Sequence, residues 1–216
     1  MNARAAIILG LSAFAGTAYA LSRSASNGPA DGINWSTLPY DFLDAGETIV
    51  NLIDEQPADV SPDVAAVNTR AFLQALQLAE GTALQPDPYR VVFGYGHVIQ
   101  DLSDHPYYTG EWQGAPFGND QWSTAAGAYQ FVRRTWSDLK DTLGLADFCP
   151  ASQDAAAIEL IRSKGALEDV KAGRFVDAVN KVRRIWASLP GAGYGQGERS
   201  IQWLTAQYLG AGGYLA

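Results

Sequence analysis

Hydrophobic residues recur at helical spacing through the segment that precedes Gly81. Leu73, Leu76 and Glu80 fall on one face of a helix, and the rest of that face is apolar. Ser61 followed by Pro62 indicates a helix start, because serine caps the first turn and proline is tolerated at the first helical position. Glycine is common just past a helix end. The pattern therefore predicts a helix that begins after Ser61 and ends at about Glu80.

A different pattern follows this helix. Residues 89–99 are rich in β-forming side chains, and their glycines permit a tight bend or a bulge. Residues 101–122 are predicted to be a loop because Pro, Gly, Tyr and Trp dominate them. Helical spacing returns from Ala125, and the candidate helices are Ala126–Leu143, Ser152–Arg162, Ala166–Ala172, Phe175–Trp186 and Glu198–Leu209. These elements predict an α+β fold that is mostly α, with a small β element after the first helix.

The N-terminal segment has the features of a targeting sequence. Residues 5–21 form a weakly apolar run behind Arg4, and Ala18-Tyr19-Ala20 matches the pattern at which signal peptides are cleaved. The run is also just long enough to span a bilayer as a helix. A cleaved signal peptide and an uncleaved signal-anchor helix therefore both stay open for residues 1–21.

Residues 22–60 are predicted to be a linker. Their first part is polar and rich in Ser, Gly and Pro, which is typical of a flexible connection. The apolar spacing within Leu38–Ile53 permits one short amphipathic helix. We expect the globular domain to occupy residues 61–216.

The composition argues against two kinds of partner. The net charge is −8, whereas nucleic-acid binding requires a basic surface, so no nucleic acid is expected. Cys149 is the single cysteine, and it cannot form an internal disulfide. With His97 and His105 as the two histidines, a Cys/His zinc site is not expected either. We predict no metal and no cofactor.

Glu80 occupies the position best suited to chemistry. It ends the apolar stripe of the first helix, one residue before Gly81. Burial and the partial negative charge of a helix C-terminus both disfavour the carboxylate, so the pKa of Glu80 should be raised. A carboxylic acid that is protonated near neutral pH can donate to the leaving oxygen in glycoside cleavage. Position alone leaves a second interpretation open, in which Glu80 reaches solvent at a helix end.

Several short blocks of sequence carry a family resemblance. In chain order they are AFLQALQLAEGT (71–82), YRVVFGY (89–95), LSDHP (102–106), STAAGAYQF (123–131), LGLADFCPASQDAAA (143–157), RSKGAL (162–167) and IWASLPGAGYGQ (185–196). Together they resemble the bacteriophage lambda endolysin family of lytic transglycosylases. The resemblance covers roughly residues 66–213 and implies a lysozyme-like fold whose one catalytic glutamate falls on Glu80.

The resemblance also implies a set of substrate-binding residues. Two blocks fall on the lining of the family's saccharide cleft, and the residues carried over are Ser123, Thr124, Tyr129, Gln130, Tyr194 and Gln196. Tyr129 and Gln130 would hold the sugars, and Ser123 or Thr124 would bind an acetamido group. One departure concerns charge, because Arg90 stands where the family has an aspartate.

The implied activity is cleavage of peptidoglycan glycan strands, in a phage endolysin or virion lysin. A lytic transglycosylase would need only Glu80, because the attacking hydroxyl belongs to the substrate. A hydrolytic muramidase would need a second carboxylate or an ordered water, and Asp101, Asp104 and Glu111 are the candidate carboxylates. A non-catalytic wall-binding virion component is a third alternative, but such a protein would be expected to have lost Glu80.

The expected partners and location follow from the family resemblance and from the apolar segment of residues 5–21. The expected ligand is the glycan strand of peptidoglycan. The host inner membrane would be a further partner through residues 5–21, and a virion role would add other virion proteins. We expect the chain to be exported to the periplasmic side of the host inner membrane, anchored there or released, or associated with the virion.

Overall fold

The computed structural model describes residues 61–117, 121–194 and 197–216. The predictions for residues 1–60, including the helix at Leu38–Ile53, lie outside this part of the chain, and so does Gln196. Among the residues that are described, no helix is both long and apolar enough to cross a membrane.

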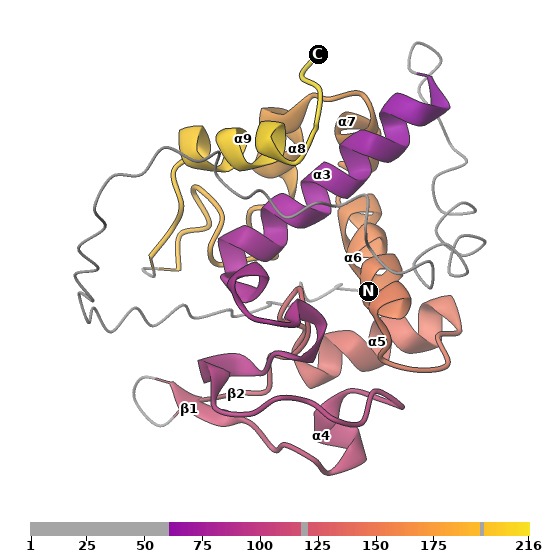
Figure 1. The fold of residues 1–216 in the computed structure, drawn as a ribbon, viewed down its shortest axis with the longest axis vertical. Helices are drawn as coiled ribbons and strands as arrows, with labels where there is room; N and C mark the ends of the chain where they lie inside the picture. The colour runs from indigo at the N-terminus through magenta and orange to yellow at the C-terminus, as the bar shows by residue number, and fades with distance from the viewer. Residues whose placement is uncertain (1–60, 118–120, 195–196) are drawn as a thin grey trace, which may run out of the picture.

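Helix α3 (Pro62–Glu80) runs diagonally through the middle of the molecule (Figure 1). Its first turn is capped by Ser61, whose Oγ accepts from the Val64 N–H at 3.4 Å. The helix ends where Gly81 adopts a φ of 78°, a left-handed conformation that costs glycine little. Both predicted ends of this helix are confirmed.

The other elements are arranged around α3 (Figure 1). Helices α7, α8 and α9 lie along one side of α3, α5 and α6 lie on another side, and α4 and the strands lie beyond its C-terminal end. Their bounds are α4 (Pro106–Thr109), α5 (Arg133–Leu143), α6 (Pro150–Ser163), α7 (Leu167–Lys171), α8 (Phe175–Val182), α9 (Ile201–Gly210), β1 (Ala115–Phe117) and β2 (Gln121–Ser123), with 3₁₀ turns η2 (Thr82–Leu84), η3 (Pro88–Arg90) and η4 (Phe93–Tyr95). The strands pair antiparallel in a small two-stranded sheet. The α+β, mostly α class is confirmed.

Aromatic packing and one buried amide hold α3 in place. Phe72 meets Phe175 of α8 edge to face with ring centroids 5.5 Å apart, and Phe175 stacks on Tyr208 of α9 at 4.4 Å. The buried Asn68 side chain donates to the Lys171 carbonyl at 2.9 Å and accepts from the Tyr214 N–H at 2.8 Å. Such contacts make α3 a rigid base for the glutamate at its end.

The β element does not lie where the sequence pattern placed it. Residues 89–99 contribute to η3 and form η4 and an isolated bridge between Val91 and Val98. The strands lie within residues 115–123, nearly all of which belong to the predicted loop of residues 101–122. Gly94 and Tyr95 adopt φ values of 79° and 57°, which curl the chain out of an extended ladder. The sequence pattern did not predict these strands because each is three residues long and one contains a proline.

The helix predicted to begin at Ala126 begins at Arg133 instead. Ala126 and Phe131 exchange two backbone hydrogen bonds, of 3.0 and 2.8 Å, and so close a tight turn. Gly127 and Gln130 have φ values of 75° and 52°, which no helix contains. This turn, residues 126–131, sits against α6 and matters for the site below.

Candidate active site

Glu80 is buried at the end of α3. Its side chain is 4% exposed, and Leu73 and Leu76 on the same face are also buried. The alternative in which Glu80 simply reaches solvent is therefore wrong. Burial raises the pKa of Glu80 to about 7, against the hydrogen bond from Ser188 and the positive charge of Arg199, which lower it. Close to neutral pH, a large share of the molecules carry Glu80 as a carboxylic acid.

Ser188 is the hydrogen-bond partner of Glu80. Its hydroxyl donates to Glu80 Oε1 at 2.5 Å across 108 residues of sequence. The Ser188 carbonyl accepts from the Arg199 N–H at 2.8 Å, which closes the base of the loop that carries Tyr194. We did not predict Ser188 from the sequence, although it lies inside the IWASLPGAGYGQ block that carried part of the resemblance.

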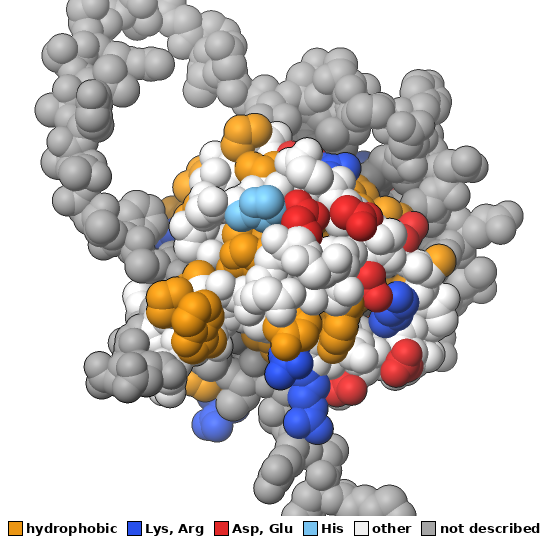
Figure 2. All heavy atoms as spheres, turned by 90° about the horizontal axis from the view of Figure 1, so that it is seen from below, with side chains coloured by type: hydrophobic (Ala, Val, Ile, Leu, Met, Phe, Trp, Pro, Cys, Tyr) orange, Lys and Arg blue, Asp and Glu red, His pale blue; other side chains and the backbone are white. Residues whose placement is uncertain are grey.

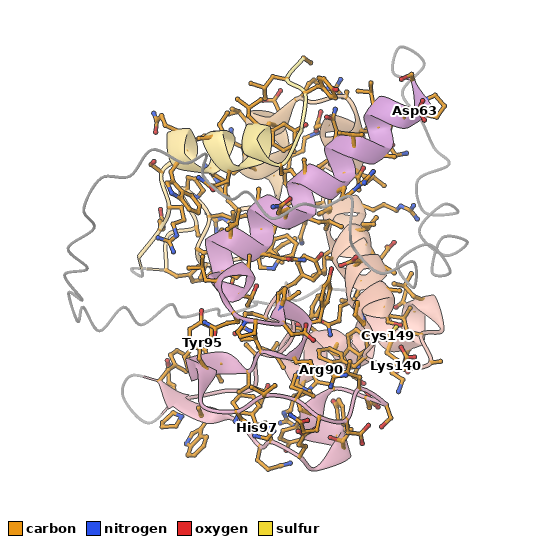
Figure 3. All side chains as sticks on the ribbon, viewed as in Figure 1. Asp63, Arg90, Tyr95, His97, Lys140 and Cys149 are labelled. Atoms are coloured by element: carbon orange, nitrogen blue, oxygen red, sulfur yellow. The ribbon has the colours of Figure 1, made fainter. Side chains whose placement is uncertain are left out.

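Tyr95 covers the other side of the α3 end. Its hydroxyl donates to the Glu80 carbonyl at 3.1 Å, and Figure 3 places it between the end of α3 and the lobe with the strands. A Cβ on Gly81 would lie 2.8 Å from the Tyr95 hydroxyl, so glycine is needed for this approach. Tyr95 is 42% exposed and also lines a shallow hollow together with Pro86, His97 and Val98. Tyr95 therefore lies between the Glu80 backbone and the solvent-exposed surface.

The surface at the strand-bearing end combines acidic and apolar side chains. Figure 2 views this end and shows acidic side chains beside a histidine, with hydrophobic side chains gathered to one side. Trp122 of β2 is 65% exposed and Val98 is 57% exposed. An exposed indole face suits the apolar face of a sugar ring.

The structure separates the predicted substrate-binding residues into two groups. Thr124 and Tyr194 are half-buried, with Thr124 Oγ1 accepting from the Arg133 N–H and the Tyr194 hydroxyl donating to the Arg184 carbonyl. These two retain side-chain surface for a ligand. Gln196 lies outside the described residues.

The other predicted residues are inside the protein. Ser123, Tyr129 and Gln130 are 2%, 0% and 4% exposed. Ser123 Oγ accepts from the Ala125 N–H, and Gln130 Nε2 donates to the Gly127 carbonyl, so both shape their own loop. A ring with no exposed surface cannot contact a saccharide in this conformation. The prediction that Tyr129 holds a sugar is therefore corrected, and Tyr129 is a core residue.

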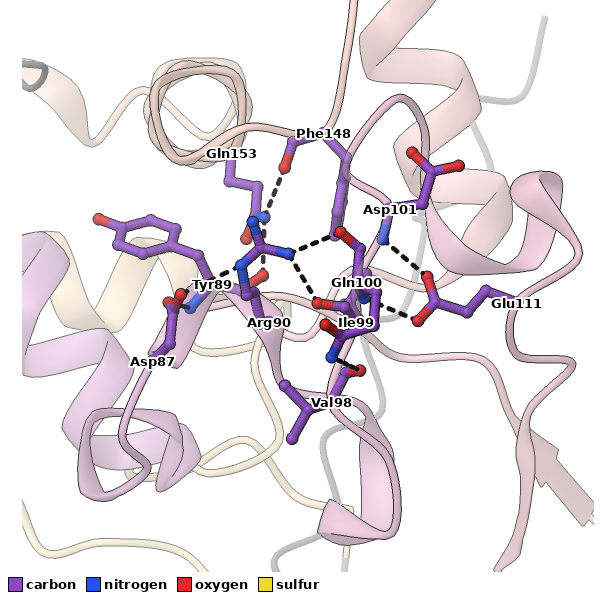
Figure 4. A network of polar contacts seen from close by, with 10 residues as sticks. All are labelled: Asp87, Tyr89, Arg90, Val98, Ile99, Gln100, Asp101, Glu111, Phe148 and Gln153. Carbon is purple, nitrogen blue, oxygen red and sulfur yellow. Dashed lines mark hydrogen bonds and ion pairs between the residues drawn. The ribbon is translucent and has the colours of Figure 1, made fainter.

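Arg90 supports the backbone of the neighbouring segment (Figure 4). Its Nη1 donates to the carbonyls of Ile99 and Gln100 at 2.8 and 2.9 Å, and its Nε lies 3.3 Å from Asp87 Oδ2. Arg90 thus has a structural role here, and no carboxylate stands at this point of the chain.

The candidate second carboxylates are engaged elsewhere. Glu111 accepts from the N–H groups of Gln100 and Asp101 (Figure 4). It also contacts His97 Nε2 at 2.7 Å. Asp104 accepts from the Trp136 indole at 2.8 Å and from Lys140 Nζ at 2.7 Å. Burial alone would raise the pKa of Asp104, but the bonds from Lys140 and Trp136 outweigh it and lower that pKa. Asp101 is exposed, and its Oδ1 accepts a hydrogen bond from the Ser103 N–H at 2.8 Å.

A helical fold with a small β lobe, and a buried carboxyl of raised pKa at the end of the central helix, is typical of the class of lysozyme-like glycan-cleaving enzymes. The family model described as Endolysin matches residues 70–215. The endolysin of Escherichia phage P2 is 43% identical over 69% of this chain and 95% of its own length. The endolysin of Escherichia phage lambda is 40% identical over 67% of this chain and 90% of its own length.

Solved structures agree with the sequence comparison. Bacteriophage lambda lysozyme complexed with a chitohexasaccharide superimposes with a TM-score of 0.64 at 38% identity, covering 69% of this chain and 97% of that one. A second structure of lysozyme from bacteriophage lambda gives 0.61 at 37% identity with the same coverage. The chain therefore belongs to the endolysin family, and it is an enzyme of the peptidoglycan-cleaving kind. The predicted lysozyme-like fold is confirmed.

Proposed function

We propose that this enzyme is a lytic transglycosylase that cleaves the β-1,4 bond between N-acetylmuramic acid and N-acetylglucosamine. The observation that carries the proposal is the buried carboxyl of Glu80 at the end of α3, whose pKa is raised to about 7 and which accepts a hydrogen bond from the Ser188 hydroxyl. The three carboxylates that could have served a hydrolytic partner role are used to hold backbone or to pair with Lys140. A mechanism with one carboxyl accounts for this arrangement most simply.

The reaction begins with protonated Glu80. Its proton passes to the glycosidic oxygen as the bond from that oxygen to C1 of the muramic acid breaks, and N-acetylglucosamine leaves with a free 4-hydroxyl. The 2-acetamido group stabilises the positive charge that develops at C1. The Glu80 carboxylate then takes the proton of the C6 hydroxyl while O6 bonds to C1. The 1,6-anhydro ring closes without water, and Glu80 is protonated again for the next cycle.

The name lysozyme, which the solved relatives carry, favours the alternative of a hydrolytic muramidase. The two reactions differ in their products. We expect the full-length chain to release fragments with 1,6-anhydromuramic ends, which mass spectrometry detects as one water lighter than hydrolysed ends. Reducing muramic ends would instead establish hydrolysis, and incorporation of ¹⁸O from labelled water would confirm that outcome independently.

Ser188 should tune the working pH range. Because its hydrogen bond lowers the pKa of Glu80, Ser188→Ala should let the carboxyl stay protonated to higher pH. We expect the alkaline limb of the activity profile to move up by about one pH unit, the value of one hydrogen bond. Ser163→Ala, which removes an exposed serine of α6, is the matched control. A limb that moves downward, or equally in both variants, would contradict this role.

Roles for Thr124, Tyr194 and Gln196 in holding the glycan strand remain part of the proposal, and the half-buried state of the first two supports it.

We also propose that residues 5–21 deliver the chain to the periplasmic side of the host inner membrane. N-terminal sequencing of the protein from membrane and periplasmic fractions would separate an anchor from a cleaved signal peptide. The same fractions would be compared with purified virions for a lysin role at infection.

A further inference from the structure

A closed polar network lies in the core behind the active site. Tyr129 donates its hydroxyl hydrogen to Asp154 Oδ1 at 2.5 Å, and the Tyr89 hydroxyl lies 3.0 and 3.3 Å from the two carboxyl oxygens of Asp154. Gln77 Nε2 donates to the Tyr129 hydroxyl at 3.0 Å and to the Tyr89 hydroxyl at 3.3 Å. Four separate parts of the chain therefore meet here: α3, η3, the turn of residues 126–131 and α6.

All hydrogens of this network have an acceptor only when Asp154 is ionised. Each phenol has one hydrogen, and because the Gln77 amide already donates to both phenol oxygens, both hydrogens point to Asp154. A carboxylate has acceptor sites for both. A protonated Asp154 would carry a hydrogen on Oδ2, and the Tyr89 hydroxyl, 3.3 Å from Oδ2, would have to turn its own hydrogen away to accept it. Since Asp154 is 1% exposed, no bulk solvent would compensate for the lost bond.

The network reaches the end of α3 through Gln77. Gln77 is one helical turn before Glu80, and its carbonyl lies 3.2 Å from Thr82 Oγ1. The Thr82 hydroxyl also donates to the Ala128 carbonyl at 2.7 Å, beside Tyr129. The residues on both sides of Glu80 are thus held by the same turn that carries Tyr129.

The network reaches Ser188 through the backbone of Tyr129. The Trp186 indole N–H donates to the Tyr129 carbonyl at 3.1 Å, and Trp186 is two residues before Ser188. Trp186 is completely buried, so a shift of Tyr129 has to move it. Both members of the Glu80–Ser188 pair are therefore positioned from Tyr129, and Tyr129 is positioned by Asp154.

We propose that Asp154 is a positioning residue for the cleavage reaction: its carboxylate holds Tyr129 and Tyr89 against Gln77 and so keeps Glu80 and Ser188 aligned with the scissile bond. The inference rests on the proposed function of Glu80. Protonation of Asp154 releases one phenol, loosens the turn of residues 126–131 and lowers the rate without abolishing substrate binding. Small misplacements of a reacting group have large effects on rate, which is why a residue without substrate contact can matter.

Opposite protonation states of two buried acids then define the active form. Burial raises the pKa of Asp154 to about 7, against the hydrogen bonds from Tyr129 and Tyr89, which lower it. Those two phenols are the titratable groups that face Asp154, and burial together with the Asp154 charge raises their pKa values, so they stay neutral. Glu80 has to be protonated and Asp154 ionised. The rising acid limb of the activity profile therefore reports Asp154, and the falling alkaline limb reports Glu80.

The decisive variant is Asp154→Asn in the full chain, which keeps the shape of the side chain and cannot ionise. We expect kcat at the optimum to fall about tenfold with KM within about twofold, as for a group misplaced by a fraction of an ångström. The acid limb should disappear and the alkaline limb should stay. Asp169→Asn is the matched control, because Asp169 is also a buried carboxylate but pairs with Arg174 and Lys181 and not with phenols. An Asp154→Asn enzyme with the wild-type acid limb would overturn the proposal.

If Asp154→Asn does not fold, Tyr89→Phe tests the role proposed for Asp154. It removes one hydrogen bond that lowers the pKa of Asp154, so the acid limb should shift to higher pH. An unmoved acid limb in this variant would equally overturn the proposal. The proposed function has a separate failure, which is retained cleavage by Glu80→Gln. An inactive Glu80→Gln enzyme combined with a wild-type profile for Asp154→Asn would remove only the present inference.

Discussion

Glu80→Gln is expected to reduce glycan cleavage by about three orders of magnitude or more, because general acid catalysis and the return of the proton are both lost. Glutamine has the same shape and can still accept from Ser188, so the fold should be kept. The release of soluble fragments from purified peptidoglycan measures the loss. Glu159→Gln, on a half-buried α6 residue that pairs with Arg162, is the control and should keep full activity. Cleavage by Glu80→Gln at near the wild-type rate would remove Glu80 from the mechanism.

The same substitution should stabilise the protein at alkaline pH. The pKa of Glu80 is about 7 in the folded state against an ordinary value of 4.5, so the folded state binds the proton more tightly. Its contribution to stability is complete below pH 4.5 and is lost as the pH rises through 7. The shift corresponds to about 3 kcal/mol. Urea unfolding should show the variant and the wild type within about 1 kcal/mol at pH 4, and the variant more stable at pH 8. Asp154 imposes a slope of the same sign on both proteins.

Gly127→Ala should be the most destabilising small substitution in the site. Gly127 has a φ of 75°, and an added Cβ would lie 2.2 Å from Gln153 Oε1 and 2.8 Å from Phe148 Cζ. Gln153 cannot simply move away, because its Oε1 accepts from the Ala128 N–H and its Nε2 donates to the carbonyls of Tyr89 and Phe148. Strain at positive φ and overpacking together should lower the free energy of unfolding by roughly 3–5 kcal/mol.

Gly144→Ala separates the two causes of that loss. Gly144 has a φ of 66° but no atom within 4 Å of the added Cβ, so only the backbone strain applies. Its cost should be about 1 kcal/mol in the same urea titration. If the two alanine variants were equally destabilised, the contact with Gln153 would have no energetic weight. Gly127 belongs to the turn that positions Tyr129. The Gly127→Ala enzyme should therefore be less active than the wild type even under conditions in which it is still folded.

What the sequence could determine by itself was local. Ser61, Pro62 and Gly81 set the ends of α3 through hydrogen bonds and backbone angles that involve only their near neighbours. The apolar spacing of Leu73 and Leu76 placed Glu80 on the buried face, but position alone left open whether its side chain reaches solvent, and the structure shows that it is buried. The mostly helical class followed from the same periodicity, and the resemblance of the sequence blocks supplied the family.

What only the tertiary structure decided depends on residues far apart in the chain. Ser188 meets Glu80 across 108 residues. The resemblance implied that Tyr129 binds a sugar, whereas the structure buries it against other elements, including Asp154, 25 residues on. The short strands pair through backbone hydrogen bonds, and no alternation of polar and apolar side chains in the sequence predicts this pairing. A periodic pattern reports which face of an element is buried, but the partner of a polar group in the core is chosen by packing, and packing is a property of the whole fold.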